Sequence, residues 1–131
     1  MLINLSNHPK EEWSATQLDI AQQEYDQIKN MSFPGIDPEW STETIIELAQ
    51  SYCQKILDLK SQLPSDAPFA VMAVGEFTFS FAIISFLQAN NITCVVTTSK
   101  RNLIKEGNRK MIDFNFVSFR QFPKINQAYE K

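Results

Sequence analysis

Short apolar runs and longer amphipathic segments follow one another along the chain, and they predict strands and helices in turn. The runs at residues 2–5, 69–74 and 92–98 have strand length and nearly continuous apolarity, which is typical of strands buried on both faces. The segments that begin near residues 14 and 41 carry apolar residues at helical spacing. We therefore expect strands that alternate with helices.

The predicted helix starts have clear local signals. Ser14 and Ser41 each suit an N-cap, and Trp13 and Trp40 precede them at the position of a hydrophobic staple. The first apolar stripe runs from Leu18 through Ala21 and Tyr25 to Ile28, and the second runs from Ile45 to Leu59.

The remaining segments complete the predicted order. Residues 77–88 are apolar almost all round and predict a buried helix, ended at Asn90-Asn91 by a left-handed residue. Residues 31–36 suit a short second strand. A hairpin turn is expected at 106–108, followed by a strand at 111–122.

This order predicts an α/β fold with a mostly parallel sheet of about five strands, helices on both faces and a C-terminal hairpin. The chain has 131 residues, enough for one domain, which we place at residues 1–122. Residues 123–131 read as a C-terminal tail.

Composition narrows the class of protein. Cys53 and Cys94 stand far apart, which argues against a disulfide framework and a zinc site and favours buried thiols. The most apolar stretch, residues 69–87, contains Gly75 and Glu76, and a carboxylate at mid-bilayer costs about 3 kcal/mol. We expect no membrane span and a cytoplasmic protein.

The net charge of −3 conceals an asymmetry. Residues 1–76 carry four Lys/Arg and twelve Asp/Glu, a balance of −8, whereas residues 77–131 carry eight and three, a balance of +5. A long nucleic acid needs a broad basic face, and this chain offers a local basic region instead. The two halves could equally attract one another, within the fold or across a dimer.

Polar residues directly follow three predicted strands. They are Ser6-Asn7-His8-Pro9, Gly75-Glu76-Phe77-Thr78 and Thr97-Thr98-Ser99-Lys100-Arg101. Because ligands of open α/β sheets bind beyond the carboxyl ends of the strands, we expect these segments to form loops around one site.

Several residues in these segments suit a phosphate-containing ligand, each with a plainer structural alternative. Lys100 and Arg101 behind three hydroxyls suit phosphate, or belong to a solvated strand exit; Arg120 joins them if its strand lies alongside. Glu76 is a candidate general base or a helix-terminal carboxylate. His8, the one histidine, is a candidate proton carrier or a structural loop residue. The phenylalanines at 77, 79, 81 and 86 suit a core better than a base-stacking platform.

In the order and spacing of these segments, with Phe116-Val117-Ser118-Phe119-Arg120-Gln121-Phe122 at the end, the chain resembles small standalone CRISPR-associated accessory proteins of type III systems. That group has ring nuclease activity on cyclic oligoadenylates. The resemblance implies a Rossmann-like three-layer domain that acts as a homodimer on a cyclic oligoadenylate, for which cyclic tetra-adenylate is the expected ring, without metal or cofactor.

The resemblance and the loop chemistry together suggest cleavage by a ribose 2′-hydroxyl. The expected catalytic residues are Glu76, Lys100, Arg101 and His8. The expected ligand-binding residues are Asn7, Gly75, Phe77, Thr78, Thr97, Thr98, Ser99 and Arg120. A binder that sequesters the same messenger without cleaving it, and a protein-interaction module with no nucleotide ligand, remain alternatives.

Overall fold

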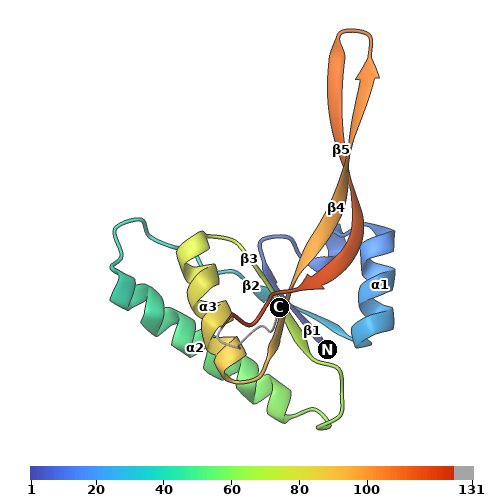
Figure 1. The fold of residues 1–131 in the computed structure, drawn as a ribbon. Helices are drawn as coiled ribbons and strands as arrows, with labels where there is room; N and C mark the ends of the chain where they lie inside the picture. Colours follow the sequence, from blue (N-terminus) through green and yellow to red (C-terminus); the bar gives the residue numbers. More distant parts are fainter. Residues whose placement is uncertain (126–131) are drawn as a thin grey trace.

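The computed structural model describes residues 1–125, which form a sheet with helices on both faces (Figure 1). The strands are β1 (Leu2–Ser6), β2 (Ile28–Ser32), β3 (Ala70–Val74), β4 (Thr93–Glu106) and β5 (Arg109–Gln121). The helices are α1 (Ala15–Tyr25), α2 (Thr42–Ser61) and α3 (Phe77–Ala89), with a short 3-10 turn, η1, at Lys10–Glu12.

The strands lie in the order β2-β1-β3-β4-β5. The β1–β2, β1–β3 and β3–β4 pairs are parallel, and β4–β5 is antiparallel. The prediction of a mostly parallel five-stranded sheet with a C-terminal hairpin is therefore confirmed. Because the strand order reverses between β1 and β3, the carboxyl ends of these strands flank the place where α/β sheets bind ligands.

Two apolar layers hold the sheet. On one face α2 and α3 pack against alternate strand residues such as Ile3, Val71 and Cys94. On the other face α1 packs against Leu2, Met72 and their neighbours. All five residues of β1 are buried, as expected for a strand that is covered on both faces.

The predicted helix starts are confirmed, because Ser14 and Ser41 cap α1 and α2 by accepting hydrogen bonds from the amides of Gln17 and Thr44. Asn91 has a positive φ of 60°, as predicted for the residues after α3. The first apolar stripe of the helix ends at Tyr25 and does not include Ile28 as predicted. The chain turns at Asp26, which has a φ of 70°, and Ile28 is the first residue of β2. The second strand accordingly lies earlier than residues 31–36.

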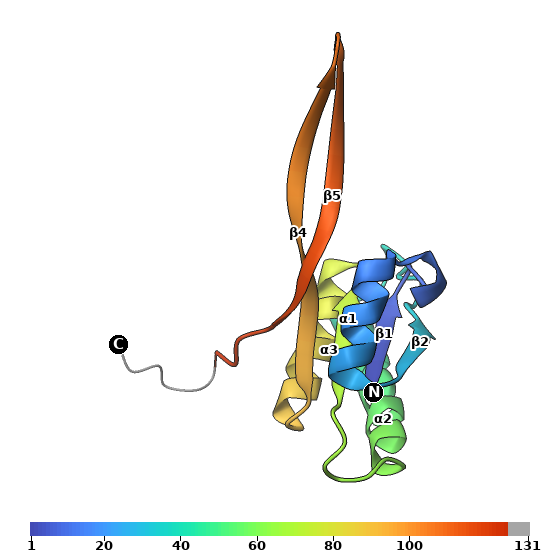
Figure 2. The same cartoon turned by 90° about the vertical axis from the view of Figure 1, so that its right-hand side faces the viewer.

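The C-terminal hairpin is longer than predicted, and its outer part stands away from the body as an arm (Figure 2). The predicted turn is correct, with Gly107 at a φ of 60° between β4 and β5. The segment Thr97–Arg101, however, is not a loop. These residues are in the middle of β4, where pairing with β5 continues after a register shift between Thr98 and Ser99.

The third helix is not buried all round. Phe79, Ile83 and Leu87 face the core, but the side chains of Phe77 and Phe81 are 90% and 77% exposed. The nearly uniform apolarity of residues 77–88 therefore reflects a helix with one face in the core and a second apolar face that no other element covers. Of the predicted tail, residues 126–131 lie outside the described residues.

Candidate functional site

A pocket of about 410 Å³, here called the rim pocket, lies at the carboxyl ends of β1 and β3 and beside the middle of β4. Segments remote in sequence meet there: the loop after β1, the start of α1, the last residues of β3 and the base of the β4–β5 arm. Its lining residues are Ser6, His8, Glu12, Trp13, Ser14, Gln17, Met72, Val74, Thr97, Thr98, Ser99, Phe114 and Phe116.

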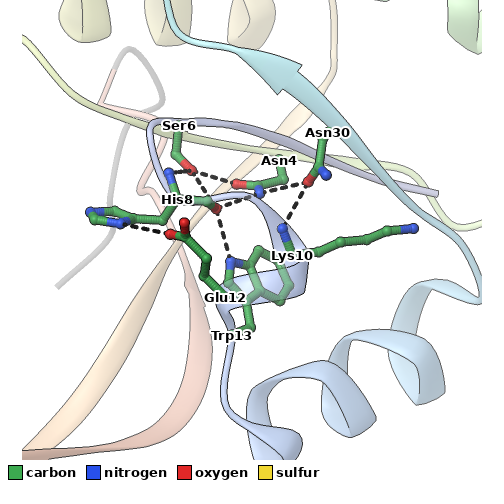
Figure 3. Close-up of polar contacts among 7 residues, drawn as sticks. All are labelled: Asn4, Ser6, His8, Lys10, Glu12, Trp13 and Asn30. Atoms are coloured by element: carbon green, nitrogen blue, oxygen red, sulfur yellow. Dashed lines mark hydrogen bonds and ion pairs between the residues drawn. The ribbon is translucent and has the colours of Figure 1, made fainter.

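A buried polar cluster fixes the loop that follows β1 (Figure 3). The side chain of Asn4, 1% exposed, donates to the carbonyl of His8 at 2.8 Å and to Oδ1 of Asn30 at 3.0 Å, and it accepts from Ser6 Oγ at 2.7 Å. Asn30 on β2 also accepts from the amide of Lys10. The loop is thus tied to two neighbouring strands.

His8 is held by its backbone while its ring stays in solvent. Its carbonyl accepts from Asn4, from Ser6 and from the indole Nε1 of Trp13 at 3.1 Å. Its imidazole Nδ1 lies 3.8 Å from a carboxylate oxygen of Glu12, and the two side chains are 79% and 63% exposed (Figure 3). An imidazole beside a carboxylate at a pocket wall can accept or deliver a proton.

Hydroxyls from the middle of β4 form the opposite wall of the rim pocket. Thr97, Thr98 and Ser99 line it, and the Thr98 hydroxyl lies 2.6 Å from the Ser118 hydroxyl on β5. The register shift at Thr98/Ser99 leaves Val117 of β5 as the extra residue, opposite the β4 hydroxyl residues that line the pocket.

Glu76 lies elsewhere and caps α3. Its carboxylate accepts from the amides of Thr78 and Phe79 and from the Thr78 hydroxyl. The hydrogen bond from the Thr78 side chain, followed by those from the two amides, lowers the pKa of Glu76 below its usual value. These contacts match the alternative of a helix-terminal carboxylate.

Gly75 is needed for packing. A Cβ at this position would overlap the ring of Phe33, which stacks edge-on against Phe79 with ring centroids 5.2 Å apart. The group that approaches the Gly75 backbone closely is thus the ring of Phe33 and not a ligand.

A second and larger pocket, of about 820 Å³, lies between α2 and α3 and is here called the α2–α3 groove. Its walls are mainly apolar, and Phe77 and Phe81 form a ridge between it and a further apolar pocket of about 450 Å³. The groove residues are Ile36, Asp37, Pro38, Trp40, Thr42, Ile45, Ile46, Glu76, Phe77, Thr78, Phe81, Ala82, Ser85 and Phe86.

The structure separates the predicted site residues into several groups. His8, Thr97, Thr98 and Ser99 meet at the rim pocket, whereas Glu76, Phe77 and Thr78 line the α2–α3 groove. Asn7 lines a small pocket of about 210 Å³ beside Asn4 and Asn30, and Gly75 lines the pocket on the far side of the phenylalanine ridge.

The predicted cations are spread along the hairpin. Lys100 and Arg101 stand on the exposed arm, and Arg120 pairs with Val96 near the base of β5. Arg101 lies directly opposite Phe114, which lines the rim pocket, so the Arg101 side chain shares a face of the ribbon with pocket residues.

Sequence reasoning missed four residues of this region. Asn4 stands inside an apolar run, where a buried amide is a recognisable signal because it needs hydrogen-bond partners. Trp13 was assigned to the helix start alone. Phe114 and Phe116 belong to the predicted strand at 111–122, and nothing local to them shows that the base of the arm lies beside the first helix.

Two further features bear on the chemistry. Within residues 1–125, no cluster of three or more His, Cys, Asp or Glu side chains has the arrangement of a metal site. Cys53 and Cys94 are free and buried, and burial, followed by the nearby Cys53, raises the pKa of Cys94 to about 12.

No helix in the described part of the chain is both long and apolar enough to cross a bilayer.

A family model described as the Uncharacterized protein MJ1673 family matches residues 1–120, so the chain belongs to that family. Neither a curated protein nor a solved structure matches the chain.

Proposed function

We propose that this member of the MJ1673 family binds a cyclic oligoadenylate at the rim pocket and cleaves it by attack of a ribose 2′-hydroxyl. The observation that carries the proposal is the meeting of His8 from the β1 loop with three consecutive hydroxyl residues of β4 at one pocket. The resemblance to type III CRISPR accessory proteins supplies the class of ligand, and places the activity in cytoplasmic antiviral defence.

The pocket offers the groups that a nucleotide needs. Hydroxyls of Thr97, Thr98 and Ser99 donate to phosphate oxygens, and Arg101 on the adjoining ribbon balances their charge. Aromatic rings at Trp13, Phe114 and Phe116 supply surfaces on which adenine bases stack.

His8 is the residue in this pocket to which we assign the proton of the attacking hydroxyl, with the Glu12 carboxylate beside it. The 2′-oxygen forms a bond to phosphorus while the bond from phosphorus to the 5′-oxygen breaks. The imidazole takes the 2′-hydroxyl proton and later releases it to solvent, the leaving 5′-oxygen takes a proton from a solvent water, and the products are a 2′,3′-cyclic phosphate and a 5′-hydroxyl. Alignment of the attacking and leaving oxygens by the pocket lowers the barrier without metal.

The pocket volume favours one ligand shared between two copies. About 410 Å³ lies near the lower end for a small-molecule site, which suits a single nucleotide unit rather than a whole ring. We therefore propose a homodimer of Rossmann-like domains in which each copy holds part of the ring.

The test is incubation with labelled cyclic tetra-adenylate, with binding and linear products measured separately. We expect His8→Ala to abolish cleavage and to leave binding nearly unchanged, and we expect Arg101→Ala to weaken binding more than Lys100→Ala, because Lys100 stands on the opposite face of the ribbon. Asn7→Ala, on the same loop but outside the rim pocket, is the matched control. Tight binding that survives both cation substitutions would contradict the placement of the ligand.

A messenger-binding protein without nuclease activity is the second candidate. It is favoured by the positions of Glu76, which caps α3, and of Lys100, which stands on the arm, because neither lines the rim pocket. Stoichiometric binding with no linear product from the wild type would establish this function and exclude cleavage.

A further inference from the structure

The two faces of the β4–β5 arm differ in charge. Side chains of directly opposed residues share a face, and residues two apart along a strand share it too. The register of the arm therefore places on one face, here called the cationic face, Ser99, Arg101, Leu103, Lys105, Lys110, Ile112, Phe114 and Phe116. This face carries three cations and no carboxylate.

The other face of the arm is electrically balanced. Lys100 and Arg109 share it with Glu106 and Asp113, so its formal charges cancel. The difference arises from the alternation of the sequence alone, and it gives the arm one face suited to an acidic and apolar partner.

The outer part of the cationic face lacks any partner within the described chain. Leu103 and Ile112 form a cross-strand apolar pair that is 53% and 46% exposed. Lys105 and Lys110 lie directly opposite each other, an arrangement that is destabilising unless an anion lies between them. A two-stranded ribbon alone is marginally stable in water, so this arm needs a covering surface.

The α2–α3 groove has the complementary character. Its lining includes the carboxylates of Asp37 and Glu76 and no Lys or Arg, and the exposed pair Phe77 and Phe81 forms the ridge along one side of it. These phenylalanines are one helical turn apart, about 5–6 Å, which is close to the spacing of directly opposed side chains on neighbouring strands, roughly 4.5–5.5 Å.

Arm and groove of a single chain do not meet. The arm rises away from the body (Figures 1 and 2). The base of its cationic face lines the rim pocket, on the side of the sheet that α1 covers. The helices α2 and α3 cover the opposite side of the sheet. An unpartnered basic, apolar surface and an unpartnered acidic, apolar surface therefore coexist on one molecule.

We infer that the arm of one copy docks by the outer part of its cationic face in the α2–α3 groove of a second copy. The Leu103–Ile112 pair packs against the phenylalanine ridge, and Lys105 and Lys110 approach Asp37 and Glu76. The contact leaves the rim pocket open, since residues 103–112 lie beyond its lining. It needs no nucleotide, so it stands or falls separately from the proposed function.

The experiment is sedimentation equilibrium of the nucleotide-free protein over a wide concentration range. We expect self-association of the wild type, at least about tenfold weaker association in Lys110→Glu, and none detectable in Phe81→Asp. Arg109→Glu, adjacent in sequence but on the balanced face, is the matched control and should associate like the wild type. All substituted side chains are exposed, and urea unfolding checks that each variant is folded.

A charge swap makes the test specific to this pair of surfaces. Asp37→Lys alone should weaken association like Lys110→Glu, and combining both substitutions in one chain should recover it, because only the contact between the reversed charges is then available. A monomeric wild type, or association that Lys110→Glu and Phe81→Asp both leave intact, would overturn the inference. The inference would also be overturned if the wild type did not self-associate but bound an oligonucleotide that Lys110→Glu no longer binds. The arm would then be a nucleic-acid-binding element.

Discussion

Asn4→Ala tests how the rim pocket is built, because Asn4 connects β1, β2 and the loop that carries His8. The substitution removes three hydrogen bonds, of 2.7 to 3.0 Å, from a side chain that is 1% exposed. A hydrogen bond of this kind contributes about 1 kcal/mol net, and an orphaned buried partner costs more.

The partners of Asn4 retain other bonds, which limits the loss. Asn30 Oδ1 still accepts from the amide of Lys10, and Ser6 Oγ still donates to the carbonyl of His8. We therefore expect Asn4→Ala to lower the free energy of unfolding by about 2–3 kcal/mol, a decrease of roughly 1–2 M in the urea midpoint.

The assay is urea unfolding followed by circular dichroism, with the exposed Asn7→Ala as control, expected to lie within about 0.5 kcal/mol of the wild type. Asn4 acts on the site through the position of His8, so the rate of cleavage should fall as well, while ligand affinity changes little and the pH dependence of cleavage keeps its shape. A variant Asn4→Ala as stable as Asn7→Ala would refute the view that this cluster holds the loop.

Three further outcomes follow from the packing and the pKa shifts. Glu76→Ala should cost about 1 kcal/mol at pH 7 through loss of the α3 cap. Because the pKa of Glu76 is lowered on folding, its stabilising contribution is present above pH 4.5 and is lost as the pH falls through the folded-state pKa, so the urea midpoints of wild type and variant should approach each other as the pH is lowered. A gap that stays constant over the whole acid range would contradict the cap. Gly75→Ala should destabilise by about 1–3 kcal/mol in the same assay, because the new methyl group displaces Phe33, and a neutral result would contradict that close approach. Cys94, whose pKa is raised to about 12 by burial, should resist iodoacetamide at pH 8 in mass spectrometry until the chain unfolds, and rapid labelling of the native protein would disprove its burial.

Local sequence signals identified most elements because each has a local cause. Ser14 and Ser41 fix helix starts by hydrogen bonds to residues three positions later, and the apolar run at 70–74 is a strand between two layers. The errors lie where distant segments decide the outcome. Thr97–Arg101 reads as a polar strand exit, but pairing with residues 114–119 keeps it in β4.

The candidate site was predicted in part for the same reason. The rule that ligands bind beyond strand ends placed His8 and the β4 hydroxyls at one rim, and they share the rim pocket. It does not distinguish the two faces of the sheet, so Glu76, which follows β3, was grouped with them although it lies in the α2–α3 groove. Whether a polar residue at a strand end faces the ligand side depends on the helix that follows it.

The two tryptophans give the most direct test of the nucleotide site, because Trp13 lines the rim pocket and Trp40 lines the α2–α3 groove. The measurement is the position of both indole N–H signals in an NMR spectrum during titration with cyclic tetra-adenylate, assigned with Trp40→Phe. We predict that the Trp13 signal shifts saturably while that of Trp40 stays in place. A shift of Trp40 alone, or of neither, would contradict the rim pocket as the nucleotide site.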